Sequence, residues 1–180
     1  MSNKVIAVDN STEPSELAAL ANDPLVTLDA TKLDLGRLPE HVKAALYTDA
    51  TTFSAPQLQT SGSIHANSAT SFSVPQLQTS GHIHAYAATS FSAPQLQTSG
   101  NIYADRATSF SAPQLQTSGH IYAYRATSFS APQLQTSGNI YAYRATSFST
   151  PQLQDSGHIS APGDTVPALM QQKQRRALHL

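Results

Sequence analysis

Hydrophobic and polar positions recur at a fixed interval through most of the chain. From Ala50 to Gly163 a nineteen-residue pattern, seen as "ATSFSAPQLQTSGHIYAYR" at 107–125, occurs six times. Fixed spacing of this kind predicts a repeat architecture instead of an ordinary globular core. Three large apolar positions are the same in every copy, and we predict that they form the core: Phe53, Phe72, Phe91, Phe110, Phe129 and Phe148; Leu58, Leu77, Leu96, Leu115, Leu134 and Leu153; Ile64, Ile83, Ile102, Ile121, Ile140 and Ile159.

Each copy fits a set of short strands separated by corners. Apolar Ile121 and polar Tyr122 lie next to each other in an alternating segment, which is the periodicity of a strand with two faces. Pro113 and Gly119 mark corners, and we expect Gly119 to adopt a positive φ. Helical repeats need roughly 33 residues, and this segment is poor in helix formers. The sequence therefore predicts an all-β repeat fold, a parallel β-solenoid of 19-residue triangular coils.

Stacking is what makes such a coil stable. A single coil buries too few side chains to offset the entropy of ordering nineteen residues. Coils spaced about 4.8 Å apart share hydrogen bonds and packing with their neighbours, so identical residues form ladders along the rod. We predict six such coils over residues 50–163.

The flanking segments are expected to cover the ends of the rod. Residues 1–49 are predicted to form a helix and a degenerate capping coil. The helix lies in "STEPSELAALAND", with Ser11 or Thr12 as its N-cap and Pro14 in its first turn. A second short helix is predicted to begin near Pro39. Residues 164–180 are expected to form a cap helix or a basic tail.

Composition narrows the function classes. Only 12% of the residues are charged and the net charge is −1, so nucleic acid is an unfavourable partner. The chain has no cysteine, which excludes disulfides and cysteine-based metal or redox sites. No segment resembles a membrane span or a secretory signal, and we expect a cytoplasmic protein. No cofactor is implied, and a regular convex rod is not expected to bind a small molecule.

The segment "APQLQTSGHIYA" resembles the degenerate leucine-rich-type β-solenoid repeats of bacterial and phage proteins. Those repeats carry a similar Ala-Pro-x-Leu, followed by Gly and an alternating strand. The resemblance covers residues 50–163. It implies a solenoid used for contact or scaffolding, and it brings no catalytic residues.

Outward-facing rows are the candidate binding residues. Tyrosines at two positions of the repeat could contact a partner's apolar face or a sugar, and three arginines form a row of like charges. Rows of threonine resemble in kind those of ice-binding solenoids. The candidate residues are Tyr103, Tyr122 and Tyr141; Tyr86, Tyr124 and Tyr143; and Arg106, Arg125 and Arg144.

Metal binding and catalysis have weaker support. His65, His82 and His84 are close in the predicted stack and form a weak candidate for a zinc site. From residue 50 onward the acids are few and widely spaced, with no nucleophile–base pattern or phosphate loop. We therefore expect a non-enzymatic scaffold or protein-interaction solenoid that contacts a protein partner or itself. The alternative is a glycan- or ice-binding surface formed by the tyrosine or threonine rows.

Overall fold

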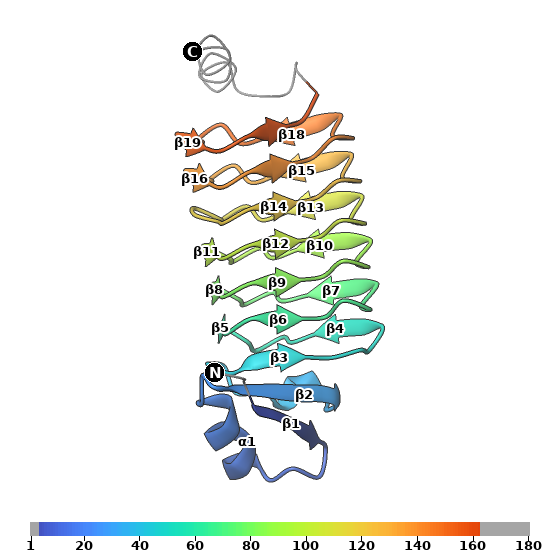
Figure 1. Ribbon diagram of the computed structural model, residues 1–180, viewed down its shortest axis with the longest axis vertical. Helices are drawn as coiled ribbons and strands as arrows, with labels where there is room; N and C mark the ends of the chain where they lie inside the picture. Colours follow the sequence, from blue (N-terminus) through green and yellow to red (C-terminus); the bar gives the residue numbers. More distant parts are fainter. Residues whose placement is uncertain (1–3, 163–180) are drawn as a thin grey trace.

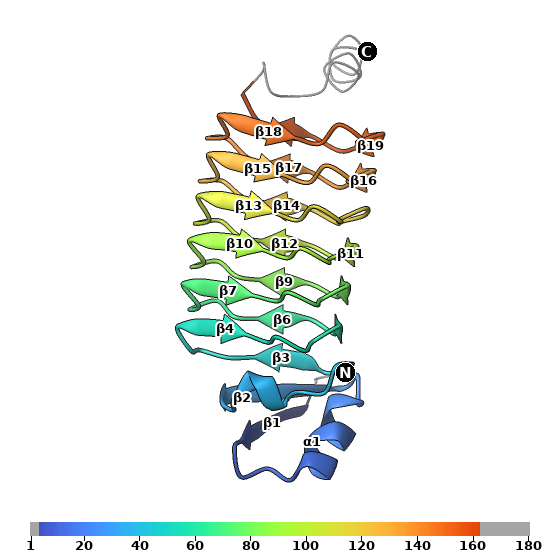
Figure 2. The same ribbon diagram turned by 180° about the vertical axis from the view of Figure 1, so that it is seen from behind.

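The computed structural model describes residues 4–162 and confirms an all-parallel β-solenoid of about eight coils. The coils stack along the long axis of the molecule, with the N-terminal helix at one end (Figure 1). The same order of coils is seen from behind (Figure 2). The predicted C-terminal helix or tail at 164–180 lies outside the described residues.

Three strands per coil give the rod three sides. The first side is a nine-stranded sheet, called here the long sheet. It consists, in spatial order, of β1 (Lys4–Asp9), β2 (Val26–Lys32), β3 (Ala45–Tyr47), β6 (Ile64–His65), β9 (Ile83–His84), β12 (Ile102–Tyr103), β14 (Ile121–Tyr122), β17 (Ile140–Tyr141) and β20 (Ile159–Ser160).

The other two sides are shorter. The Phe sheet has six strands: β4 (Thr52–Ser54), β7 (Ser71–Ser73), β10 (Ser90–Ser92), β13 (Ser109–Ser111), β15 (Ser128–Ser130) and β18 (Ser147–Ser149). The third side consists of β5 (Thr60–Ser61), β8 (Thr79–Ser80) and β11 (Thr98–Ser99), followed by β16 (Thr136–Ser137) and β19 (Asp155–Ser156). Single bridges through Thr117 join these two groups.

The predicted core ladders lie inside the rod. The phenylalanine rings stack along the axis with centroids 4.6–5.4 Å apart and planes within 14° of parallel. The leucine and isoleucine ladders are buried as well. Phe148, in the last complete copy, packs against the core but is partly exposed. Identical side chains in register therefore fill the interior, as the spacing predicted.

The glycine corners differ from the prediction. No glycine in residues 4–162 has a positive φ, so the expectation for Gly119 is wrong. Close approach between coils explains the glycines instead. A Cβ added to Gly100 would lie 2.7 Å from the carbonyl oxygen of Gly81 and 2.8 Å from Nδ1 of His82. A side chain at this corner would therefore push neighbouring coils apart.

The N-terminal helix is present and shows how the rod begins. Helix α1 spans Pro14–Ala21, with Pro14 at its start and Leu17 buried. Its N-cap is Glu13, and no side chain caps the helix. The predicted capping by Ser11 or Thr12 is wrong, because both side chains bond to Asp9 in the preceding turn.

The segment after Pro39 is irregular up to strand β3 at Ala45–Tyr47, so the second predicted helix is wrong. Strand β3 pairs with β2 and β6, and buried Leu46 extends the isoleucine ladder by one coil. This burial and pairing outweigh the local helix signal. A 3-10 turn, η1 (Leu35–Arg37), precedes it. Strand β1 was not anticipated; it pairs with β2 and is the first strand of the long sheet.

Candidate binding surface

The outer face of the long sheet carries a continuous row of aromatic side chains. We call this row the aromatic ladder, and its members are joined by strand register: Tyr47, His65, His84, Tyr103, Tyr122 and Tyr141. From His65 onward adjacent rings are stacked, with centroids 4.5, 4.7, 4.8 and 5.1 Å apart and planes within 20° of parallel. The ladder therefore covers the faces of its rings and directs their edges outward.

The sequence predicted three tyrosines of this ladder but not its full length. His84 and His65 are nineteen and thirty-eight residues before Tyr103, so the spacing itself could have placed them in the row. Tyr47 lies in a coil of a different length, where Leu46 pairs with Ile64 eighteen residues later. Only the register of the strands identifies Tyr47 as a member.

A second row runs beside the aromatic ladder. We call it the flanking row, and its members are Tyr86, Asp105, Tyr124 and Tyr143, as the nineteen-residue spacing predicts for the tyrosines. Its tyrosines lean on ladder rings of the next coil, with centroids 5.3 Å apart for Tyr86 and Tyr103 and 5.7 Å for Tyr124 and Tyr141. Tyr143 stacks on Tyr124 at 5.4 Å and is 54% exposed. Asp105 interrupts the row.

A third row holds the coils together. Its members from Ser63 to Asn139, nineteen residues apart, each accept a hydrogen bond from the backbone N–H one coil later. Nδ1 of His82 accepts from Asn101 at 2.9 Å, and Oδ1 of Asn101 accepts from His120 at 2.8 Å. The amide of Asn101 also donates to the hydroxyl of Tyr103 at 3.1 Å, and Asn139 does the same for Tyr141 at 2.9 Å. These bonds fix the ladder tyrosines from the side.

The three histidines of the candidate metal site lie close together but do not converge. His65 and His84 are stacked face to face at 4.5 Å, and His82 meets His84 edge-on at 6.3 Å. Imidazole lone pairs lie in the ring plane, so stacked rings do not direct them at one ion. Nδ1 of His82 is already a hydrogen-bond acceptor. No group of three potential ligands in residues 4–162 could hold a metal ion.

Burial shifts the pKa values of several groups on this face. Desolvation, followed by the charges of His65 and His82, lowers the pKa of His84 to about 4. Desolvation also lowers the pKa of His65. The pKa values of Tyr122 and Tyr124 are raised, mainly by desolvation. Burial therefore favours the uncharged forms of His65, His84 and Tyr122.

The arginine and threonine candidates lie at the corners. Arg106, Arg125 and Arg144 are exposed. Along one threonine row each hydroxyl donates to the carbonyl of the threonine one coil earlier, as Thr108 does to Thr89 at 3.2 Å. The same bond is repeated at 3.2–3.3 Å by Thr70, Thr89, Thr127 and Thr146. These hydroxyls are therefore part of the inter-coil bonding.

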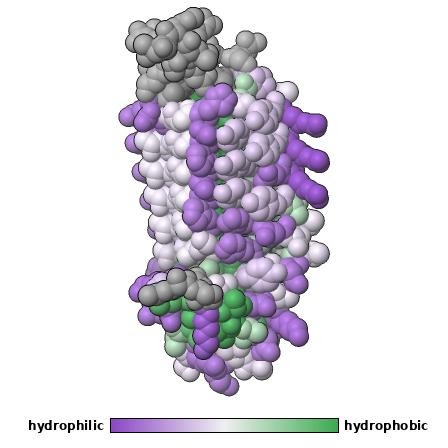
Figure 3. Space-filling view, viewed as in Figure 1, coloured by the Kyte–Doolittle hydropathy of each residue, from purple (hydrophilic) through white to green (hydrophobic). Residues whose placement is uncertain are grey.

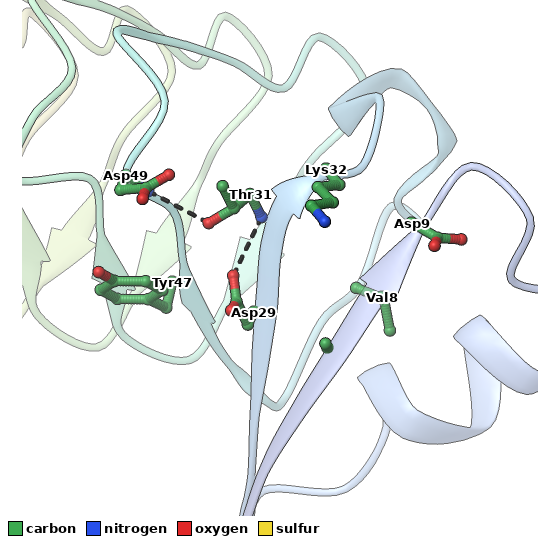
Figure 4. A pocket seen from close by; sticks show the side chains of 8 residues that line it. Val8, Asp9, Asp29, Thr31, Lys32, Tyr47 and Asp49 are labelled. Atoms are coloured by element: carbon green, nitrogen blue, oxygen red, sulfur yellow. Dashed lines mark hydrogen bonds between the residues drawn. The ribbon is translucent and has the colours of Figure 1, made fainter.

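An open hollow of about 410 Å³ lies between the first coils (Figure 4). Asp29, Thr31 and Asp49 line it, and Tyr47 of the aromatic ladder stands at its side. The polar groups bond to one another: Oδ1 of Asp29 accepts from the N–H of Thr31 at 3.2 Å, and the N–H of Asp49 donates to Oγ1 of Thr31 at 3.4 Å. The aromatic ladder therefore ends, at Tyr47, beside a hollow lined by polar side chains.

None of the helices in residues 4–162 is long and apolar enough to span a bilayer. The sequence matches no protein-family model, and neither the curated proteins nor the solved structures contain a match to it.

Proposed function

We propose that this protein is a non-enzymatic scaffold that contacts a protein partner through the aromatic ladder and the flanking row. The observation that carries the proposal is the ladder itself, six aromatic residues in unbroken register on one outer face. Tyrosine suits such a role because its ring supplies apolar area and its hydroxyl a hydrogen bond. A rod of stacked coils presents this area as an extended and rigid strip.

Ring orientation favours a protein partner over a glycan. A sugar packs against an aromatic face, but both faces of Tyr103 and Tyr122 are covered by neighbouring rings, and Tyr141 has one face covered by Tyr122. Ice binding by the threonine row has little support, since its hydroxyls donate to backbone carbonyls. We expect no signal from the wild-type protein on a polysaccharide array. Binding that disappears when the three tyrosines are changed to serine would support the glycan alternative instead.

Self-assembly is a second way for the rod to act as a scaffold. Strand β1 is the last strand at its end of the long sheet, and such edges pair readily with other strands. Val5 and Leu25 at this end are 65% and 59% exposed. Hydrophobic surface also gathers at the N-terminal end in the space-filling view (Figure 3). Electron microscopy across a concentration series tests this idea: filaments support it, and monodisperse rods at every concentration refute it.

The contact role is tested by replacing three ladder tyrosines. Tyr103→Ser, Tyr122→Ser and Tyr141→Ser together remove the outward rings and leave the core unchanged. The matched control replaces Thr89, Thr108 and Thr127 by Ser, which keeps every donating hydroxyl at another corner. Both variants must give the wild-type circular dichroism spectrum.

The readout is the protein that co-purifies with the native molecule. We expect the tyrosine variant to lose this partner and the threonine variant to retain it. A folded tyrosine variant that still captures the partner in wild-type amount would overturn the proposed contact surface.

A further inference from the structure

Asp105 stands where the repeat otherwise places a tyrosine. In the coil before it this position is Tyr86 and in the coil after it Tyr124. Those two rings lean over the aromatic ladder, whereas Asp105 has a shorter carboxylate in place of a third ring. We call this place the Asp105 notch. It lies within the proposed contact surface.

One oxygen of the Asp105 carboxylate lacks a partner. Its Oδ2 atom is buried and makes no hydrogen bond to any of the described residues. Desolvation raises the pKa of Asp105, and a backbone hydrogen bond offsets part of this effect. Its charge also contributes to the raised pKa values of Tyr86, Tyr122 and Tyr124, which places these groups around it. A buried acceptor of this kind is destabilising until a donor reaches it.

The spacing of the rings limits what fits the notch. Tyr86 and Tyr124 are two coils apart, roughly 9.6 Å at 4.8 Å per coil. A planar group midway between them would have each ring at about the spacing of the stacked rings in this molecule, 4.5–5.4 Å. A guanidinium group is planar, stacks on aromatic faces and donates paired hydrogen bonds to a carboxylate. An ammonium group would pair with the charge of Asp105, but it is not planar and would not stack between the two rings.

We infer that the Asp105 notch binds the guanidinium group of an arginine side chain on the partner, stacked between Tyr86 and Tyr124 and hydrogen-bonded to Asp105. Rotation of the Asp105 side chain brings the buried oxygen to the incoming N–H groups. The inference rests on the proposed contact role of this face and names the chemistry of the partner.

The test uses N-acetylarginine amide as the probe and N-acetylcitrulline amide as its neutral control. Two-dimensional ¹H–¹⁵N NMR of the full chain follows the backbone amides of Asp105, Arg106 and Arg125. We expect saturable shifts at these amides with a dissociation constant in the millimolar range, and at least tenfold weaker binding of the citrulline probe. Equal shifts from both probes, or no saturable shift with the arginine probe, would overturn the inference.

Three variants locate the effect. Asp105→Asn keeps the shape of the side chain and is expected to weaken the arginine probe at least tenfold. Asp155→Asn makes the same change of charge on β19, away from the long sheet, and is expected to bind as the wild type does. Full binding by Asp105→Asn would refute the notch. Asp105→Tyr restores the residue of the neighbouring coils and should abolish binding without disturbing the fold.

The outcomes separate this inference from the proposed function. If the arginine probe fails to bind but the serine variant of the ladder still loses the partner, the contact role stands and the notch does not. If the probe binds and the serine variant keeps the partner, the notch stands as a cation site and the contact role does not.

Discussion

Replacing Phe110 by alanine tests the physical basis of the fold. Phe110 is fully buried, and its ring stacks on Phe91 at 4.8 Å and on Phe129 at 4.6 Å. Truncating a buried phenylalanine costs about 3–5 kcal/mol, and each lost aromatic pair accounts for about 0.5–1.5 kcal/mol of that. Because Phe110 loses two ring contacts in a rigid ladder, we expect a loss near the upper end, about 4–5 kcal/mol.

The chain supplies its own control at the end of the ladder. Phe148 is partly exposed and stacks with one ring, Phe129, at 4.8 Å. Phe148→Ala removes less buried area and only one aromatic pair, so we expect a loss of about 2 kcal/mol. The side chain removed is the same in both variants. The difference therefore measures the greater burial of Phe110 together with its second ring contact.

The assay is denaturant unfolding followed by circular dichroism, with hydrogen exchange as a second probe. Repeat rods can unfold in parts, so the exchange rates of coils on either side of each substitution show whether the loss is local. Phe110→Ala should increase the hydrogen-exchange rates of backbone amides on both neighbouring coils. If Phe110→Ala is no more destabilising than Phe148→Ala, the stacked ladder is not the source of stability and the argument fails.

Three further predictions concern single positions. Gly100→Ala should destabilise the rod by about 1–3 kcal/mol in denaturant unfolding, because its Cβ meets the carbonyl of Gly81; an unchanged midpoint would contradict this. Burial lowers the pKa of His84 to about 4, so the unfolded chain gains a proton between pH 6.5 and 4 that the folded chain does not. As the pH is lowered through that window, the free energy of unfolding should therefore fall by about 1–2 kcal/mol, a value reduced to allow for solvent screening of this partly exposed group. His84→Tyr should remove this contribution. Asp105→Tyr should raise stability by about 1–3 kcal/mol, since it removes an unpaired buried oxygen and adds ring contacts; a lower thermal midpoint would count against this account.

Much of the surface followed from the repeat alone. Wherever the coil length is nineteen, a residue such as Tyr103 stacks on the residue nineteen places away, and the rows of tyrosine were predictable for this reason. The histidines of the aromatic ladder obey the same rule. The weak zinc candidate rested on residue type, whereas strand register places His65 and His84 in the ladder.

Other features depend on contacts that spacing does not describe. Gly100 does not have a positive φ. A glycine is needed there because the carbonyl of Gly81 and the imidazole of His82, both in the preceding coil, leave no room for a Cβ, and local turn propensities do not reveal this. The strand at Ala45–Tyr47 forms because β2 and β6 offer it two pairing partners, whereas its local sequence favours a helix. The missing partner of the Asp105 Oδ2 atom is likewise a property of its surroundings.

The nineteen-residue period by itself determined the solenoid, the core ladders and the rows on the repeat surface, because identical coils can stack only with identical residues in register. Tertiary structure decided how the rod begins. Leu28 pairs with Leu46 and Leu46 with Ile64 at a spacing of eighteen residues, and Ile6 pairs with Leu28 at twenty-two. Hydrogen bonding between strands tolerates such differences in loop length, since it depends on where the chains meet and not on how many residues separate them.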